Sequence, residues 1–146
     1  MWERAVDSND VREASRSSVA VSLLGSLRVV RYGADATLAP SRKVRALMAY
    51  LVMAPRPVHR ARLCEMFWDV PNDPRGELRW CLSKIRGLVG DPSHERVKAE
   101  NDLVSIDTST IDVDALCVAA RAEGAISGGD LDLLKQLAAK FGGEFL

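Results

Sequence analysis

The stretch from Asp73 to Gly90, DPRGELRWCLSKIRGLVG, constrains the fold more than any other part of this chain. At about 100° per residue, a helix over these residues gathers six apolar side chains on one stripe: Leu78, Cys81, Leu82, Ile85, Leu88 and Val89. Asp73 followed by Pro74 is typical of a helix start, and Gly90 is typical of a helix end. The stretch therefore predicts one capped amphipathic helix with a buried face.

The opposite face of this helix is rich in groups that donate hydrogen bonds. It carries Arg75, Arg79, Trp80, Ser83, Lys84 and Arg86, together with Gly76 and Gly87. A helix that is buried on one side and basic on the other suits the major groove of DNA. Arg79 and Lys84 could pair with the O6 and N7 atoms of guanine, although an ordinary solvated helix face would carry the same residues. Trp80 is either a contact with the groove wall or part of an interface with another protein.

Charge is distributed unevenly along the chain, although its total is zero. Residues 41–98 contain 12 basic and 6 acidic side chains, whereas residues 99–146 contain 3 basic and 9 acidic ones. A cationic segment favours a nucleic-acid partner, because neutralised phosphates supply most of the non-specific affinity. Two solvated faces that differ by chance would give the same pattern.

Shorter patterns on either side of this helix predict an α+β fold. Residues 20–39 predict a small antiparallel sheet, and residues 96–107 predict a β-hairpin. Apolar stripes predict two further helices, over about residues 41–54 and 60–68, with the loop 69–73 leading into the basic helix. This order of an N-terminal sheet, three helices and a C-terminal β-hairpin wing is that of a winged helix, over residues 19–108.

The two ends of the chain carry different signals. Residues 1–18 are polar and of mixed charge, which predicts a disordered leader and not a signal peptide. Residues 109–146 predict a helical pair, over about 112–122 and 130–141, separated by a glycine-rich turn at 124–129. No apolar run approaches the roughly 20 residues that span a bilayer. We therefore expect a cytoplasmic protein with no membrane partner.

The residues that could carry catalysis or bind a metal are few. Cys64, Cys81 and Cys117 are an odd number without CxxC spacing, and each lies on a predicted apolar helix face, which predicts reduced core thiols. His59 and His94 are too few and too far apart to suggest a metal site with them. A glycine-rich phosphate loop and a persuasive pair of carboxylates are both missing. The sequence thus predicts no enzyme, no metal and no cofactor.

Five segments together resemble a known family. They are LLGSLRVVRYG, SRKVRALMAYLVMAP, HRARLCEMFW, LRWCLSKIRGLVG and RVKAENDLVSIDTSTIDVDAL. Their order is very similar to the OmpR/PhoB-type winged helix, and more narrowly to the one at the N-terminus of antibiotic-regulatory, SARP-like bacterial transcriptional activators. The resemblance covers about residues 21–146, and its most specific piece is LRWCLSKIRGLVG beside the upstream LCEMFW.

This resemblance implies a function and partners. It implies a sequence-specific DNA-binding domain of a bacterial transcriptional regulator that binds double-stranded DNA. Residues 109–146 would begin the helical activation domain, with tetratricopeptide-like repeats, that follows in the family. RNA polymerase is a further partner that the resemblance implies, and a homodimer on DNA is also expected.

The resemblance also implies roles for single residues. Arg79, Trp80, Ser83 and Lys84 occupy groove-facing positions, and Arg86 a position near the DNA backbone. Independently of the resemblance, Arg60 and Arg62 open the second helix, whose N-terminal amides could also bind a phosphate, although both arginines could simply be solvated. Arg96 and Lys98, on the first strand of the wing, could also touch the DNA backbone.

The wing departs from the family pattern. Many relatives carry a basic arm with a Gly-Tyr pair, whereas this chain has Ala99, Glu100, Asn101 and Asp102. An acidic tip should repel phosphate. This tip, the acidic last third of the chain and Trp80 leave a second function open, a protein-interaction module that kept the winged-helix core and lost DNA binding.

Overall fold

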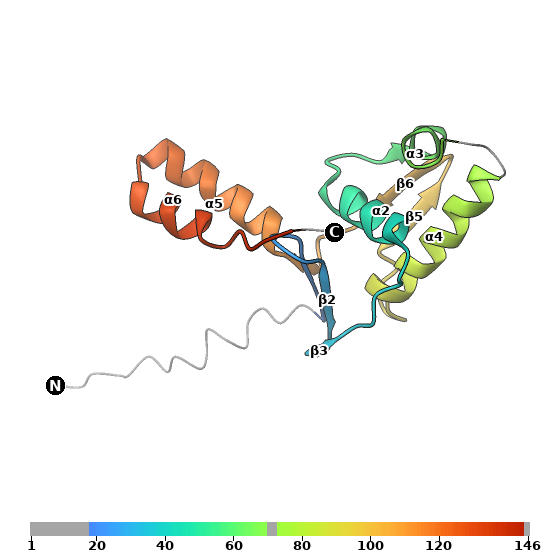
Figure 1. Cartoon of the computed structure of the whole chain (residues 1–146), viewed down its shortest axis with the longest axis horizontal. Coiled ribbons are helices and arrows are strands. Elements are labelled where there is room, and N and C mark those ends of the chain that lie inside the picture. The colour runs from blue at the N-terminus through green and yellow to red at the C-terminus, as the bar shows by residue number, and fades with distance from the viewer. Residues whose placement is uncertain (1–17, 70–72, 145–146) are drawn as a thin grey trace.

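The computed structural model describes residues 18–69 and 73–144, which form an α+β fold (Figure 1). Its strands are β1 (Val19–Ser22), β2 (Arg28–Arg31), β3 (Ala34–Asp35), β4 (Val58–His59), β5 (Val97–Glu100), β6 (Leu103–Ile106) and β7 (Ile111–Val113). Its helices are α2 (Arg42–Met53), α3 (Arg60–Phe67), α4 (Pro74–Val89), α5 (Asp114–Gly128) and α6 (Leu131–Ala138). Figure 1 shows the sheet that contains β2 between the α5–α6 pair on one side and α2, α3 and α4 on the other. Residues 1–17 of the expected leader, and 70–72 of the expected loop, lie outside the described residues.

The strands form two small sheets, with the orders β3-β2-β1-β7 and β4-β6-β5. Strands β1, β2 and β3 are antiparallel, as predicted for residues 20–39. Strand β7 pairs with β1 in parallel, so the helix start predicted at residue 112 is wrong. Ile111 and Val113 are buried and Asp112 is exposed, which is the two-residue period of a strand.

Helix α4 has the boundaries and the buried face that the sequence predicts. The Asp73 carboxylate accepts a hydrogen bond from the Gly76 amide at 2.9 Å, Pro74 is the first helical residue, and Gly90 is the C-cap. All six residues of the predicted stripe are buried. The inner stripe of α2 is likewise buried, and α2 and α3 pack against α4 around one core. The core therefore fixes which face of α4 points outward.

The wing is the hairpin of β5 and β6, as predicted for residues 96–107. Asn101 and Asp102 have φ angles of 51° and 62°, the left-handed conformation that a two-residue type I′ turn requires. Strand β4, which lies within no predicted strand, pairs with β6. The Arg60 amide donates a hydrogen bond to the Asp102 carbonyl oxygen at 2.8 Å, so the wing tip is held against the start of α3.

The C-terminal helices form the predicted pair with different boundaries. Helix α5 continues through Gly124 to Gly128, so the glycine-rich turn predicted at 124–129 is wrong. The turn is made by Gly129, with a left-handed φ of 68°, and by Asp130, whose carboxylate accepts from the Leu133 amide at 2.9 Å. Packing of the pair outweighs the low helix propensity of glycine, about 1 kcal/mol relative to alanine.

The burial along α5 differs from the prediction at Cys117. Val118 and Ala125 are buried on α5, and Cys117 is exposed, so the core position expected for this thiol is wrong. Cys64 and Cys81 are buried as predicted, and burial raises the pKa of both thiols. Helix α6 ends at Ala138, so Phe141, the last residue of the helix predicted over residues 130–141, lies outside it and is 63% exposed.

The helical pair is attached to the first sheet at two places. The Asp114 carboxylate, at the start of α5, accepts hydrogen bonds from the amides of Leu23 at 2.7 Å and Leu24 at 3.3 Å. After α6 the chain returns to the sheet, where the Gly142 amide donates to the Leu24 carbonyl oxygen at 3.0 Å and Gly142 forms a parallel bridge with Gly25. The pair is thus docked on the sheet and not only tethered to it.

Replacing Gly25 with alanine tests this docking. A Cβ at Gly25 would collide with the Gly142 carbonyl oxygen. We expect Gly25→Ala to release the segment around Gly142, which should give new early cleavage after residue 138 in limited proteolysis. Gly33→Ala is the matched control, because Gly33 also has a positive φ (81°) but a Cβ there meets nothing within 4 Å. Identical cleavage of the two variants would contradict the docking.

Candidate nucleic-acid interface

The outer face of α4 presents every side chain that the sequence places there. Arg75, Arg79, Trp80, Ser83, Lys84 and Arg86 are all exposed. Their orientation follows from the core, because a helix with one buried stripe must turn its remaining residues outward. The six residues therefore lie on one surface, with the fold as a rigid support behind them.

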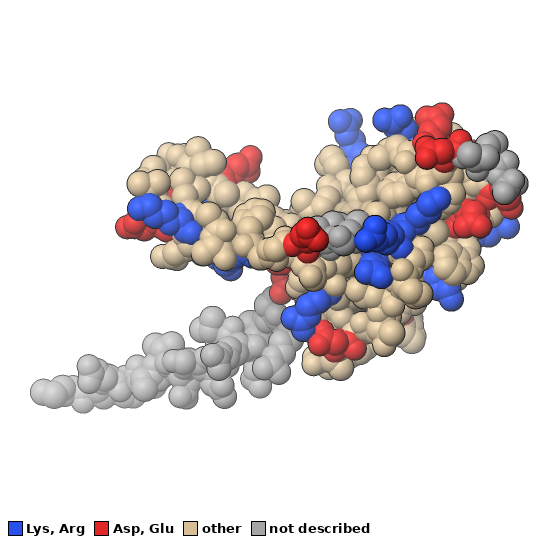
Figure 2. Space-filling view, viewed as in Figure 1, with Lys and Arg blue, Asp and Glu red and all other residues tan. Residues whose placement is uncertain are grey.

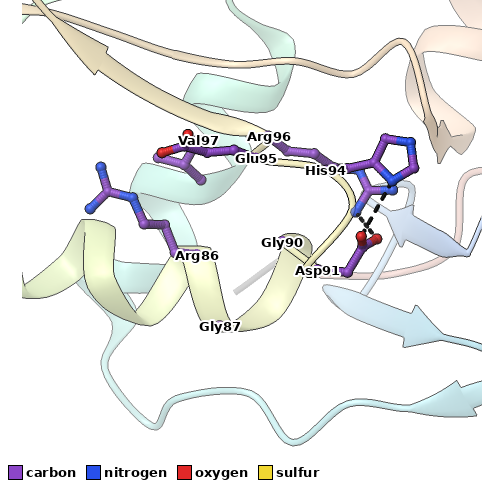
Figure 3. A pocket seen from close by; sticks show the side chains of 8 residues that line it. All are labelled: Arg86, Gly87, Gly90, Asp91, His94, Glu95, Arg96 and Val97. Carbon is purple, nitrogen blue, oxygen red and sulfur yellow. Dashed lines mark hydrogen bonds and ion pairs between the residues drawn. The ribbon is translucent and has the colours of Figure 1, made fainter.

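One flank of this surface faces the start of the wing. Arg86 lines a cavity of about 380 Å³ together with Glu95 and Val97 (Figure 3). Figure 3 shows the Arg86 side chain rising from α4 and the loop from Gly90 to Val97 closing the other side. A partner that lies along α4 would meet the Arg86 guanidinium group on this flank.

The other flank faces the segment that leads into α2. Trp80 and Lys84 line a second cavity, of about 480 Å³, with residues 37–40. The Lys84 Nζ lies 5.4 Å from the centroid of the Trp80 ring, within the range of a cation–π contact. Trp80 remains 48% exposed. A large aromatic side chain thus stands beside a cation on an open surface.

The middle of the surface carries small residues. Gly76, Ser83 and Gly87 fall within about 40° of one another on a helix of 100° per residue. A Cβ at Gly87 would meet nothing within 4 Å, so this position is open to solvent. At Gly76 the Asp73 carboxylate fills the space that a Cβ would take, so a flat partner such as a base edge could come close to the α4 backbone only around Ser83 and Gly87.

Basic side chains extend this surface beyond α4. In the view of Figure 2, lysine and arginine side chains lie over α2 and along α4. Arg42 and Lys43, in the first turn of α2, are both exposed. The Lys43 Nζ lies 5.4 Å from the centroid of the Trp68 ring, which holds it near the C-terminal end of α3.

Arg60 begins α3, and Arg75 lies in the first turn of α4, which packs against α3. Burial raises the pKa of the Cys64 thiol on α3, and the positive charges of Arg75 and Arg60 partly oppose this rise. Arg60 is half-buried, whereas Arg62 is exposed and lies 3.7 Å from the Glu65 carboxylate. Because exposed pairs of this kind contribute little, Arg62 remains able to bind an anion.

Arg96 is not a surface residue, and the phosphate contact expected for it is wrong. It is 2% exposed, and its guanidinium group donates to the Val89 carbonyl oxygen at 2.7 Å and to the Asp91 carboxylate at 2.9 Å. It also donates to the hydroxyl groups of Thr110 at 2.9 Å and Ser18 at 3.2 Å. Figure 3 shows Asp91 facing Arg96 and His94. The side chain is held by the protein and has no reach to DNA.

Lys98 is exposed on β5, and its Nζ lies 3.4 Å from the Asp107 carboxylate on the neighbouring strand end. Hydrogen bonds from Ser109, and then from Lys98, lower the pKa of Asp107, so this partner is charged at neutral pH. Glu100 and Asp102 at the wing tip are exposed as well. The wing thus offers a lysine that is already paired, beside an acidic tip.

Arg31 is a residue of this region that the sequence did not reveal. It reaches from β2 to the last turn of α4 and donates to the carbonyl oxygens of Gly87 and Gly90, both at 2.7 Å. These carbonyl groups have no partner within the helix, and a cation there also complements the helix dipole. The sequence holds no signal for this contact, because an arginine on a short strand is usually solvated.

Two further observations bear on the kind of protein. Within residues 18–69 and 73–144, no three His, Cys, Asp or Glu side chains lie close enough to hold a metal ion. None of the helices that the structure describes is both long and apolar enough to cross a membrane.

One solved structure similar to this chain is that of Mycobacterium tuberculosis EmbR in complex with a low affinity phosphopeptide. The TM-score is 0.67 at 22% sequence identity, over 90% of this chain. The chain spans only 38% of the length of the EmbR chain. No protein-family model matches the sequence, and no curated protein matches it. The predicted α+β winged-helix fold is confirmed, and at this identity the likeness extends to the fold alone.

The acid stability of the protein tests the Arg96–Asp91 contact. Burial acts to raise the pKa of Asp91, but hydrogen bonds from Arg96, the Ser93 amide and His94 prevail and lower it from 3.8 to about 2. Charged Asp91 therefore stabilises the fold fully above about pH 4, and this contribution is lost as the pH falls toward 2. We expect Asp91→Asn to lower the Tm at pH 7 and to reduce the fall in Tm between pH 4 and pH 2.

The control is Asp35→Asn, because the Asp35 carboxylate also pairs with an arginine, Arg28, but at the exposed surface. This variant should keep the parent's Tm at pH 7 within error. If the Asp91→Asn and parent curves run parallel across the acid range, Asp91 does not contribute as described.

Proposed function

We propose that residues 19–108 are the sequence-specific DNA-binding domain of a bacterial transcriptional regulator, and that α4 reads the major groove. The observation that carries this proposal is the outer face of α4. There, five exposed side chains, four of them arginine or lysine, surround a line of small residues that includes Ser83, on a helix fixed by the core. Major-groove recognition needs such a helix, with hydrogen-bonding side chains and close approach of the backbone.

The position of each residue around α4 suggests its role. Ser83 lies about 20° and Arg79 about 60° from the middle of the outer face, at 100° per residue. We assign these two residues to base edges. Arg86, Lys84 and Arg75 lie about 80–100° from the middle, where a groove-bound helix faces the phosphates. We therefore assign Lys84 to a phosphate and not to the base contact that the sequence first suggested.

The surroundings of α4 supply further candidates for phosphate contacts. Arg60 and Arg62 lie in the first turn of α3, the helix that packs against α4. Lys98 could join them only by leaving Asp107. The acidic wing tip, held to α3 through Arg60, makes the minor groove a poor partner for this wing.

We further propose that residues 109–146 begin a helical activation domain. Ile126 on α5, Leu131 on α6 and Phe141 just after α6 are at least 61% exposed, and a stacked helical repeat buries such residues against its neighbour. RNA polymerase, and a second copy on DNA, remain the protein partners expected from the family resemblance. The proposed role is binding and not catalysis, carried out in the cytoplasm without a cofactor.

A protein-interaction module on the same scaffold is the second candidate function. The exposure of Trp80, the acidic wing tip and the net charge of −6 over residues 99–146 favour it. A mobility shift with random duplex over a salt series separates the two. DNA binding should weaken steeply as salt rises, because each neutralised phosphate releases counterions. An interaction module should bind little DNA at any salt.

Arg79→Ala tests the assignment of α4. On a duplex selected from a random pool by the parent protein, we expect a loss of about 1–3 kcal/mol and a relaxed preference at one base position. Thermal unfolding should be unchanged within about 0.5 kcal/mol, because Arg79 is exposed. The measurement is fluorescence anisotropy on the selected duplex and on single-base variants of it.

Arg121→Ala is the matched control, since Arg121 is an exposed arginine on α5, outside the proposed surface. It should bind as the parent does. Equal affinity of the parent and Arg79→Ala for the selected duplex would rule out Arg79 as a groove contact.

A further inference from the structure

We propose that the cleft between Trp80 and residues 37–40 receives the sugar–phosphate backbone of one DNA strand, with Lys84 pairing with a phosphate. This proposal rests on the proposed function and deepens it. It assigns a role to Trp80, for which the sequence left two interpretations open. It also adds the segment before α2, which no sequence pattern marked, to the DNA-binding surface.

The cleft is an open space with fixed walls. Its volume is about 480 Å³, with Trp80 and Lys84 on one wall and the segment Thr37–Pro40 on the other. Arg45 of α2 holds this segment, because its Nε donates to the Ala39 carbonyl oxygen and its Nη2 to the Pro40 carbonyl oxygen, both at 3.1 Å. The wall opposite Trp80 is therefore preorganised, and an occupant need not order it.

The lining matches a deoxyribose phosphate in chemistry. Trp80, Leu38 and Pro40 offer apolar surface, and Lys84 is the single charged residue among those that line the cleft. No acidic residue lines it. A deoxyribose presents C–H groups, and the phosphate next to it carries one negative charge. An apolar wall with one cation at its edge suits that pair, since lysine binds phosphate as a point charge.

The position of the cleft on α4 favours the DNA backbone, and not a base edge, as its occupant. Trp80 and Lys84 lie about 40° and 80° from the middle of the outer face, both on the side toward α2. A helix in the major groove has one DNA strand along each flank. The cleft lies on one flank, and the exposed residues Arg42 and Lys43 continue from the segment that forms its wall. One strand could run from Lys84 past Trp80 toward the start of α2.

Three variants of the full chain test the cleft on the duplex that the parent selects from a random pool. Trp80→Ala should weaken binding roughly fivefold to tenfold, equally for every single-base variant of the duplex. Trp80→Phe keeps an apolar ring and should recover most of that loss. Lys84→Gln should weaken binding. It should also make the slope of log K against log salt shallower by about the amount that one phosphate contact contributes. Thermal melts confirm folding, and Arg121→Ala serves as the charge control.

A second measurement places the phosphate. In a series of duplexes, each phosphate in turn is replaced by an uncharged methylphosphonate. One position should weaken binding of the parent and of Trp80→Ala but leave Lys84→Gln unaffected, since that variant has already lost the contact. Additive losses at every position would overturn the pairing of Lys84 with a phosphate.

The remaining outcomes separate this proposal from the proposed function. A changed base preference in Trp80→Ala would overturn the backbone assignment in favour of base reading. Arg79→Ala could weaken binding while Trp80→Ala and Lys84→Gln bind as the parent does. In that case DNA does not occupy the cleft, and a protein partner becomes its occupant. If the parent itself shows no salt-dependent binding to duplex, the proposed function fails and the cleft proposal fails with it.

Discussion

The Arg96 guanidinium group lies where the N-terminal sheet, the end of α4 and the loop before the wing meet. A buried charge is costly unless it is paired and hydrogen-bonded, and this one has four partners: Val89, Asp91, Thr110 and Ser18. Ser18 and Thr110 directly precede the paired strands β1 and β7, Val89 ends α4, and Asp91 begins the loop before the wing, so Arg96 joins the first sheet to the end of α4 and to that loop. The geometry of the winged helix therefore depends on one satisfied cation beside an apolar core.

Arg96 acts together with Arg31 on the same end of α4. Between them they occupy the carbonyl oxygens of Gly87, Val89 and Gly90, from β2 on one side and from the loop before β5 on the other. The last turn of a helix otherwise frays, because its carbonyl groups lack partners. A recognition helix fixed at this end keeps its outer face in one orientation, which lowers the entropy lost when it binds.

The features that the sequence predicted are local ones, and those it missed depend on distant partners. The caps and the buried stripe of α4 are set within its own residues, so periodicity was enough. The burial of Arg96 depends on Ser18, 78 residues away, and no spacing rule reports such a contact. Strand β7 forms because β1 is available to pair with it, and the same residues otherwise fit the first turn of a helix.

The candidate surface was predictable to the same extent. The apolar stripe of α4 predicted which of its side chains point outward. It did not predict which segments lie beside the two flanks of this outer face. The cleft with residues 37–40 and the cavity beside residues 95–97 arise from the tertiary placement of two loops. The burial of Arg96 removes one of the two phosphate contacts that the family resemblance implied for the wing, and leaves Lys98, an exposed lysine paired with Asp107, as the other.

A net charge of zero is compatible with this surface because its charges are separated in space. The acidic last third of the chain includes the α5–α6 pair, which Figure 1 shows on the far side of the β2 sheet from α4. At physiological salt, charges are screened beyond about 8 Å. The acidic residues of the α5–α6 pair therefore do little to cancel the potential at α4, whereas Glu100 and Asp102 of the wing tip belong to the DNA-binding domain itself and oppose phosphate there.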